Sequence, residues 1–217
     1  MTSDFRIERH IFYSPKFRSV VEEAISFFMT TPVSNLPPAQ QFGGVGVYAL
    51  YYIGGAKFYA PISEANSDAL LLPIYVGKAV PTGWRKGRAR LSQGPELHRR
   101  LSEHFRSVEA ASGIEPKDFK ARFMILKGAE VDLVVPIEAE LIRRYVPVWN
   151  TVIDGFGNHD PGSGRYDQAP SEWDILHPGR TWAMRLKGTA PSLEAVRTKL
   201  RGHLSSPGFP HVDDRFI

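Results

Sequence analysis

Residues 45–53, with the sequence VGVYALYYI, limit the possible folds of this chain more than any other segment. The stretch is apolar and aromatic, is rich in residues that favour strands, and has glycines on both sides, so it predicts a largely buried strand. A second strand is predicted within LLLPIYVGKA, at residues 70–79. A third is predicted within DFKARFMILKG, at residues 118–128, where the side chains alternate.

Helical spacing of apolar residues occurs in three further segments. An amphipathic helix is predicted at residues 16–30, and another at 96–111, where Leu97, Leu101, Phe105 and Val108 recur on one face. A third is predicted from residue 134, with Pro147 beyond its end, and a short terminal helix at residues 191–204. The prolines within residues 31–44 break regular structure. This order of elements indicates a mixed α+β domain.

The composition limits the classes of function that this protein can have. The net charge is +4, which suits a polyanionic partner, and the chain has no cysteine. Disulfides, zinc–thiolate sites and a cysteine nucleophile are therefore excluded. Residues 1–10 lack the apolar core of a signal peptide, and no stretch reaches the roughly 18 apolar residues that span a bilayer. We expect a cytoplasmic protein without a membrane partner.

Three tyrosines compete for one site. Tyr48 and Tyr52 face the same side of the first strand but lie about 13 Å apart, because a strand rises roughly 3.3 Å per residue. Tyr75 on the second strand can lie opposite or diagonal to Tyr48, about 5–8 Å away. Gly77, after Tyr75, lets a backbone or ligand approach closely. We therefore pair Tyr48 with Tyr75 and interpret Tyr52 as an ordinary strand residue.

Gly46-Val47-Tyr48 and Tyr75-Val76-Gly77 resemble the two half-motifs of the GIY-YIG nuclease superfamily. The usual gap between the halves is about ten residues, whereas 26 separate them here, which resembles an insertion in the restriction-endonuclease branch. The strings GVYALYY, LPIYVGKAVP, DGFGNHDPG and HPGR are similar to the subgroup whose site is the palindrome CCGCGG. Further residues match the family pattern: Arg100 and His104 on the first core helix, Glu138 as the metal-binding glutamate, and Asn150, twelve residues on, as the asparagine that closes the core.

This resemblance implies a small antiparallel three-stranded sheet with flanking helices at residues 45–150. Residues 1–44 and 151–217 are then N- and C-terminal elaborations of helices and loops within a single domain, 1–217. The implied activity is Type II cleavage of double-stranded DNA at a short, GC-rich palindrome, with Mg²⁺ as cofactor and Mn²⁺ as a possible substitute. A homodimer and a cognate DNA methyltransferase are the implied partners. A repair-like nicking endonuclease and a non-catalytic DNA-binding module are the alternatives.

Two glutamates compete to be the carboxylate of the site. Helical geometry separates Glu138 from Glu140 by about 200°. Glu138 shares the apolar face of its helix, whereas Glu140 lies nearer to Arg143 and Arg144. A carboxylate on a core-facing stripe is costly to bury unless it binds a cation or hydrogen-bond donors. Glu138 is therefore the predicted metal ligand.

The mechanistic hypothesis gives Tyr48 the role of general base, with His104 helping to accept its proton. A free tyrosine has a pKa of about 10, so positive charge from Arg100 and the metal is expected to lower it. Arg100 and Lys78 are candidates to contact the phosphate, Tyr75 to position water or phosphate, and Asn150 to close the core or to cap a turn. Covalent attack by Tyr48 is a variant of this hypothesis.

Two loops are candidate DNA contacts. The basic loop at residues 81–95 carries Arg85, Lys86, Arg88 and Arg90, which suit the DNA backbone. Asn158 and His159 lie in the Gly/Pro-rich loop at residues 154–165. His159 with Asp160 also fits a separate metal or histidine-based nuclease centre, but no second ligand cluster has suitable spacing. We predict that this loop is structural or contacts DNA.

Overall fold

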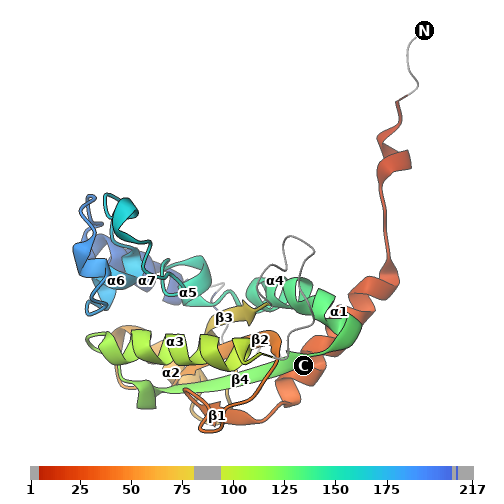
Figure 1. Cartoon of the computed structure of the whole chain (residues 1–217), viewed down its shortest axis with the longest axis horizontal. Coiled ribbons are helices and arrows are strands. Elements are labelled where there is room, and N and C mark those ends of the chain that lie inside the picture. The colour runs from red at the N-terminus through yellow and green to blue at the C-terminus, as the bar shows by residue number, and fades with distance from the viewer. Residues whose placement is uncertain (1–4, 81–93, 207–208, 210–217) are drawn as a thin grey trace.

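The computed structural model describes residues 5–80, 94–206 and 209 (Figure 1). Its strands are β1 (Val33–Asn35), β2 (Val45–Tyr52), β3 (Pro73–Ala79) and β4 (Phe119–Leu126). Its α-helices are α1 (Pro15–Thr30), α2 (Ala60–Ala65), α3 (Glu96–Ala110), α4 (Val134–Tyr145), α5 (Val148–Thr151), α6 (Glu172–Leu176) and α7 (Leu193–Leu204). Short 3₁₀ turns are η1 (Ile7–His10), η2 (Lys57–Tyr59), η4 (Pro116–Asp118), η5 (Gly128–Leu133), η6 (Ser163–Arg165) and η7 (Ala183–Arg185).

The sheet is antiparallel and has helices around it. The predicted α+β class is therefore confirmed. Its strand order is β1-β4-β2-β3, so it has four strands where three were predicted. The additional strand, β1, pairs Val33 with Arg122 and Asn35 with Lys120. Its three residues lie between Pro32 and Pro37 and are too few to show an alternating pattern. A proline-flanked edge strand of this length is not readable from sequence.

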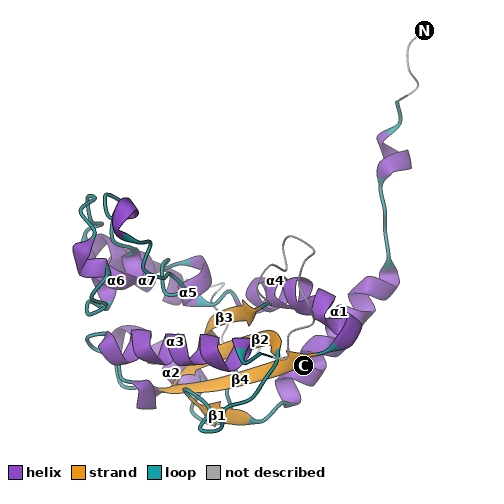
Figure 2. Ribbon diagram, viewed as in Figure 1, coloured by secondary structure: helices purple, strands orange, loops and turns teal. Residues whose placement is uncertain are grey.

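Strand β2 is buried along all eight of its residues because helices cover both faces of the sheet (Figure 2). Tyr48, Leu50 and Tyr52 join one core cluster together with side chains of α3, α5, α6 and α7. The intervening residues, Val47, Ala49 and Tyr51, join a second cluster with side chains of α1 and α4. The central, largely buried strand predicted from VGVYALYYI is therefore confirmed.

The predicted helix boundaries agree with local capping. Ser14 caps α1, where its hydroxyl accepts from the backbone N–H of Phe17 at 3.3 Å, and Pro15 follows in the first turn. Helix α4 ends at Val146, which has a left-handed backbone (φ 44°), and Pro147 then separates α4 from α5. The predicted end of this helix before Pro147 is therefore confirmed.

The insertion between the half-motifs forms η2 and α2 and is closed at its base by Asn66. The side-chain amide of Asn66 donates to the carbonyls of Tyr52 and Leu72, both at 3.0 Å. Its oxygen accepts from the N–H groups of Leu71 and Leu72 at 3.0 and 2.8 Å. These bonds fix the two ends of the insertion beside each other, so β2 and β3 pair as directly connected strands do.

The segment HPGR joins the C-terminal extension to the end of α3. The N–H of Ser112 donates to the carbonyl of Pro178 at 2.9 Å, and His177 Nδ1 contacts the carbonyl of Ser112 at 3.2 Å. Gly179 is required for this contact, because a Cβ there would lie 1.6 Å from the carbonyl oxygen of Ala110. The extension therefore lies beside α3, as Figure 1 shows for α6 and α7.

Candidate active site

The two half-motif tyrosines lie together on neighbouring strands. In the β2–β3 ladder Tyr48 is opposite Gly77 and Leu50 is opposite Tyr75, which makes Tyr48 and Tyr75 diagonal neighbours. Their ring centroids are 6.2 Å apart, within the predicted range. A Cβ on Gly77 would lie 2.4 Å from the Tyr48 hydroxyl, so the glycine makes room for the ring that crosses it. The predicted pairing of these tyrosines is confirmed.

Tyr52 shares the strand face of Tyr48 but has a different environment. Its hydroxyl accepts a hydrogen bond from the backbone N–H of Ala56 at 2.8 Å. Its ring packs edge-on against Tyr59 and Phe119, with centroids 5.2 and 5.3 Å away. Tyr52 therefore supports the insertion and the core.

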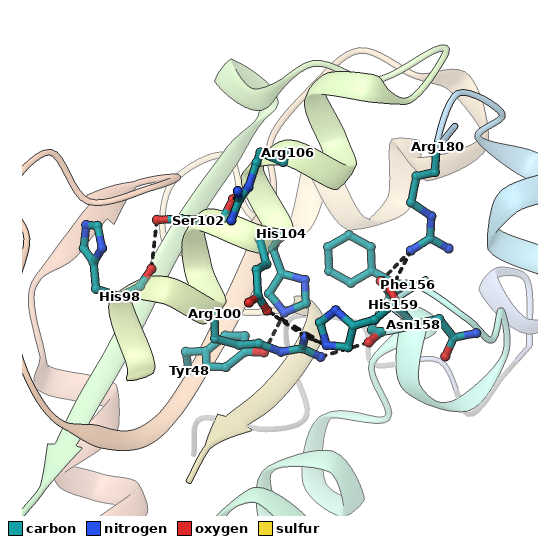
Figure 3. A network of polar contacts seen from close by, with 12 residues as sticks. Tyr48, His98, Arg100, Ser102, His104, Arg106, Phe156, Asn158, His159 and Arg180 are labelled. Atoms are coloured by element: carbon teal, nitrogen blue, oxygen red, sulfur yellow. Dashed lines mark hydrogen bonds and ion pairs between the residues drawn. The ribbon is translucent and has the colours of Figure 1, made fainter. Parts of the chain in front are cut away.

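His104 lies deeper than predicted. The buried face of α3 consists of Leu97, Leu101, His104 and Val108, whereas Phe105 is only partly buried. This is the i, i+4, i+7, i+11 spacing of a core stripe, and the periodicity argument wrongly gave the third place to Phe105. His104 Nε2 is 2.6 Å from the hydroxyl of Tyr48 (Figure 3).

Both partners of this contact are neutral near pH 7. Burial raises the pKa of Tyr48 well above its usual value, Tyr75 raises it further, and Arg100 acts in the opposite direction. Burial lowers the pKa of His104 well below its usual value, and the charge of Arg100 lowers it further. The Tyr48 hydroxyl donates to His104 Nε2 in the tautomer that carries the ring proton on Nδ1. Arg100 lowers the pKa of Tyr48 as expected, but burial outweighs this effect and the net shift is upward.

Arg100 projects from α3 into the same region, one turn before His104. One guanidinium nitrogen, Nη1, donates to Glu103 Oε2 at 3.0 Å and also contacts His159 Nε2. The other, Nη2, donates to the backbone carbonyl of Gly157 at 2.9 Å. Two of the three partners belong to the loop after α5, as Figure 3 shows for His159. The predicted i, i+4 pair on α3 thus meets a C-terminal loop.

Glu138 and Lys78 form an ion pair across α4 and β3, with side chains 15% and 31% exposed. Glu140 points elsewhere, where it forms ion pairs with Arg143 and Arg144. The predicted separation of the two carboxylates is therefore confirmed. In the described part of the chain, no three or more His, Asp or Glu side chains gather around a common point that could hold a metal ion.

Asn150 stabilises the edge strand that carries Tyr75. Strand β3 is the last in the sheet, so one side of it has no strand partner among the described residues. The side-chain oxygen of Asn150 accepts from the N–H of Val76, and its amide donates to the carbonyl of Val76, both at 2.8 Å. A single side chain thus pairs with β3 as another strand would.

The loop after α5 supplies residues that sequence reasoning missed. The Phe156 ring stacks on His104, with centroids 4.5 Å apart and an interplanar angle of 16°, and covers its outer face. Gly157 and Glu103 hold Arg100, as described above. The signal for Glu103 was its i+3 spacing from Arg100, and the signal for Phe156 was an aromatic residue between glycines. The spacing of Glu103 indicates its partner on the same helix, whereas the pattern at Phe156 does not say which distant helix the ring meets.

The predicted residues meet in one cleft of about 490 Å³. The cleft is lined by Tyr48, Tyr75, Lys78, Ala79, Val80, Glu96, Arg99, Arg100, Glu103, Glu138 and His159. His104 lies behind Tyr48 and Asn150 behind β3. Asn158 lines two adjoining hollows of about 140 and 380 Å³, which also share His159. His159 therefore lies at the border of the cleft and of both hollows. Arg85, Lys86, Arg88 and Arg90 lie outside the described residues.

Comparison with known proteins assigns the family. The model of the Eco29kI GIY-YIG domain, a restriction endonuclease family, matches residues 40–204. The chain belongs to this family. No curated protein matches the sequence. Because the match extends past residue 150, the Eco29kI family pattern includes the loop with Phe156 and His159.

Membership of this family establishes the general type of activity. As an Eco29kI-type GIY-YIG restriction endonuclease, the protein is a site-specific nuclease whose substrate is DNA. The resemblance found in the two half-motifs is thereby confirmed. Among the described helices, none has both the length and the apolar character to cross a membrane.

Proposed function

We propose that the protein is a Type II endonuclease that hydrolyses both strands of a short, GC-rich palindromic DNA site. The observation that supports this most strongly is the 2.6 Å contact between Tyr48 and His104 inside a cleft that also contains Arg100 and Glu138. A proton acceptor, a cation and a carboxylate around one space are what phosphodiester hydrolysis requires.

In the proposed reaction Tyr48 is the general base for the attacking water. Its own proton passes to Nε2 of the neutral His104, which lies 2.6 Å from the hydroxyl and is the acceptor when the ring proton is on Nδ1. Because of this relay, the Tyr48 hydroxyl does not need to ionise on its own. Burial disfavours that ionisation. Arg100 contributes positive charge to the developing transition state, and Tyr75 positions the water or the phosphate.

A divalent metal fits Glu138 as a carboxylate ligand. Mg²⁺ keeps several waters and is commonly bound through one or two carboxylates together with substrate phosphates. Glu138 as one carboxylate ligand matches that mode, since among the described residues no three His, Asp or Glu side chains form a cage made by protein alone. When bound, Mg²⁺ or Mn²⁺ would neutralise phosphate charge and stabilise the leaving oxygen. Lys78, the present partner of Glu138, would then be free to contact the phosphate.

The deciding experiment is incubation with plasmid DNA and Mg²⁺, with EDTA as a control. Discrete fragments are expected, and sequencing of their ends gives the site. Nicks or a smear would indicate a repair-like nuclease, and retardation without cleavage a DNA-binding module. Glu138→Ala should abolish cleavage and retain DNA binding. Glu140→Ala is the matched control and should have a mild effect; strong cleavage by Glu138→Ala would refute the assignment of the metal ligand.

A palindromic site further implies two active sites related by symmetry, so we propose a homodimer on DNA. The segment before α1 extends away from the remaining fold (Figure 1) and exposes Phe5, Ile7, Ile11, Phe12 and Tyr13. These side chains offer an apolar surface to a second copy. Sedimentation with and without DNA tests the dimer, with Phe12→Ser as the variant expected to weaken it. A cytoplasmic role beside a DNA methyltransferase of the same specificity completes the proposal.

A further inference from the structure

Arg100 is held by a segment outside the core that carries the half-motifs. Residues 155–159, named here the cleft loop, follow α5 and belong to the C-terminal extension. Within it, the carbonyl of Gly157 accepts from Arg100 Nη2 at 2.9 Å, and His159 contacts Nη1. A Cβ on Gly157 would lie 2.8 Å from the Tyr75 hydroxyl and 3.3 Å from Arg100 Nη2. The cleft loop therefore lies directly against the site.

Three other carbonyls of the cleft loop accept from a second arginine. Arg180, the last residue of HPGR, donates from Nη2 to Gly155 at 2.9 Å. Its Nη1 donates to Phe156 at 3.1 Å and to Asn158 at 3.2 Å. The cleft loop thus accepts hydrogen bonds from two guanidinium groups. Three of its carbonyls accept from Arg180, and that of Gly157 accepts from Arg100.

Arg180 is itself fixed in place. Its side chain is 3% exposed, and its Nε donates to Asp174 at 2.7 Å. The rings of Trp173 and Trp182 each lie 4.6 Å from its guanidinium carbon. A buried guanidinium is stable only with such charge and hydrogen-bond partners. Arg180 therefore sets the conformation of the cleft loop.

Fixing Arg100 matters because a free arginine side chain has several rotatable bonds. Ordering such a side chain costs conformational entropy, and that cost slows the reaction if it falls on the transition state. Donors that are already oriented in the free enzyme avoid it.

We propose that Arg180 and His159 are positioning residues for cleavage, which act by holding Arg100 through the cleft loop. This inference rests on the proposed nuclease function. It makes the C-terminal extension part of the active site. It also distinguishes His159 from a direct DNA contact, the role that its 62% exposed side chain would otherwise suggest.

The test measures single-turnover cleavage rates and DNA dissociation constants of the full chain. Arg180→Lys keeps the charge beside Asp174 but loses the fork that binds three carbonyls, and should lower the cleavage rate about tenfold or more. His159→Ala should lower it about threefold to tenfold. In both variants the DNA dissociation constant should stay within about twofold of the wild-type value. Arg185→Lys is the matched control, because Arg185 pairs with Asp160 at 2.7 Å in the same extension, and should leave the rate unchanged.

The decisive arm repeats both substitutions in an Arg100→Ala background. If the two residues act through Arg100, neither should slow cleavage further. A slowing as large as in the wild-type background, or weaker DNA binding by His159→Ala, would overturn the inference. Should Arg180→Lys fail to fold, as a melting curve would show, His159→Ala decides alone, since its side chain is exposed. A wild-type protein that cleaves no DNA would refute the proposed function instead.

Discussion

Phenylalanine substitutions at Tyr48 and Tyr52 form a matched pair that tests the proposed base. Both tyrosines lie on the same face of β2, both are fully buried, and each substitution removes one hydroxyl. The Tyr48 hydroxyl is hydrogen-bonded to His104 Nε2 at 2.6 Å, whereas that of Tyr52 accepts from the N–H of Ala56 at 2.8 Å. The two substitutions therefore perturb the core in similar ways. Only the substitution at Tyr48 is expected to affect the chemistry as well.

The expected magnitudes separate these effects. Leaving a buried polar partner without its hydrogen bond costs about 1–3 kcal/mol of unfolding free energy. For a chain of 217 residues this corresponds to a melting point lowered by about 2–10 °C, for either variant. General acid–base catalysis contributes about 10²–10⁴-fold in rate, so Tyr48→Phe should lose that factor. Tyr52→Phe should stay within about threefold of the wild-type rate when measured well below its melting point.

The assay combines single-turnover cleavage of plasmid DNA with thermal melting of each variant. DNA binding measured in EDTA shows whether either substitution affects affinity, and no change is expected. A Tyr48→Phe enzyme within tenfold of the wild-type rate would refute the base assignment. A larger loss with Tyr52→Phe than with Tyr48→Phe would mean that the wrong tyrosine was placed in the site.

Three further outcomes are expected. Asn150→Ala removes both 2.8 Å bonds to Val76 and should lower the unfolding free energy by about 2–3 kcal/mol in urea titrations; an unchanged midpoint would contradict its role at β3. Burial lowers the pKa of His177 to about 4, so its stabilising contribution is complete above pH 6.5 and is lost as pH falls toward 4. Unfolding titrations should show a loss of about 2 kcal/mol by pH 5 from this residue, which His177→Gln should lack. Gly77→Ala places a Cβ 2.4 Å from the Tyr48 hydroxyl and should lower both melting point and cleavage rate, whereas normal values for both would show that the ring has room to move.

Local patterns were sufficient for much of the fold. Strand β2 was readable because a continuous apolar run must be covered on both faces, and α4 because its apolar stripe and Pro147 define its course and end. The rise of a strand was enough to reject Tyr52 as the partner of Tyr48. Periodicity alone separated Glu138 from Glu140, which the ion pairs of the two carboxylates agree with.

The features that could not be predicted from the sequence depend on contacts between distant segments. The pKa of Tyr48 is governed by burial, which no neighbouring residue in the sequence reveals. Phe156 covers His104, and Gly157 binds Arg100, across more than fifty positions of the chain. The strand β1 forms only because β4 offers it an edge. Loop–helix contacts of this kind have no periodic signature.

The insertion closed by Asn66 has a consequence for how such enzymes are found and altered. Its four hydrogen bonds join the two ends of the insertion, so Tyr48 stays opposite Gly77 in the ladder although 26 residues separate the two half-motifs. A search pattern with a fixed gap between the half-motifs would overlook proteins of this kind, and one that scores each half with its own flanks would retain them. Any change to the insertion should spare Tyr59 and Ile62, because both are buried in the core that also contains Tyr48 and side chains of α5 and α7.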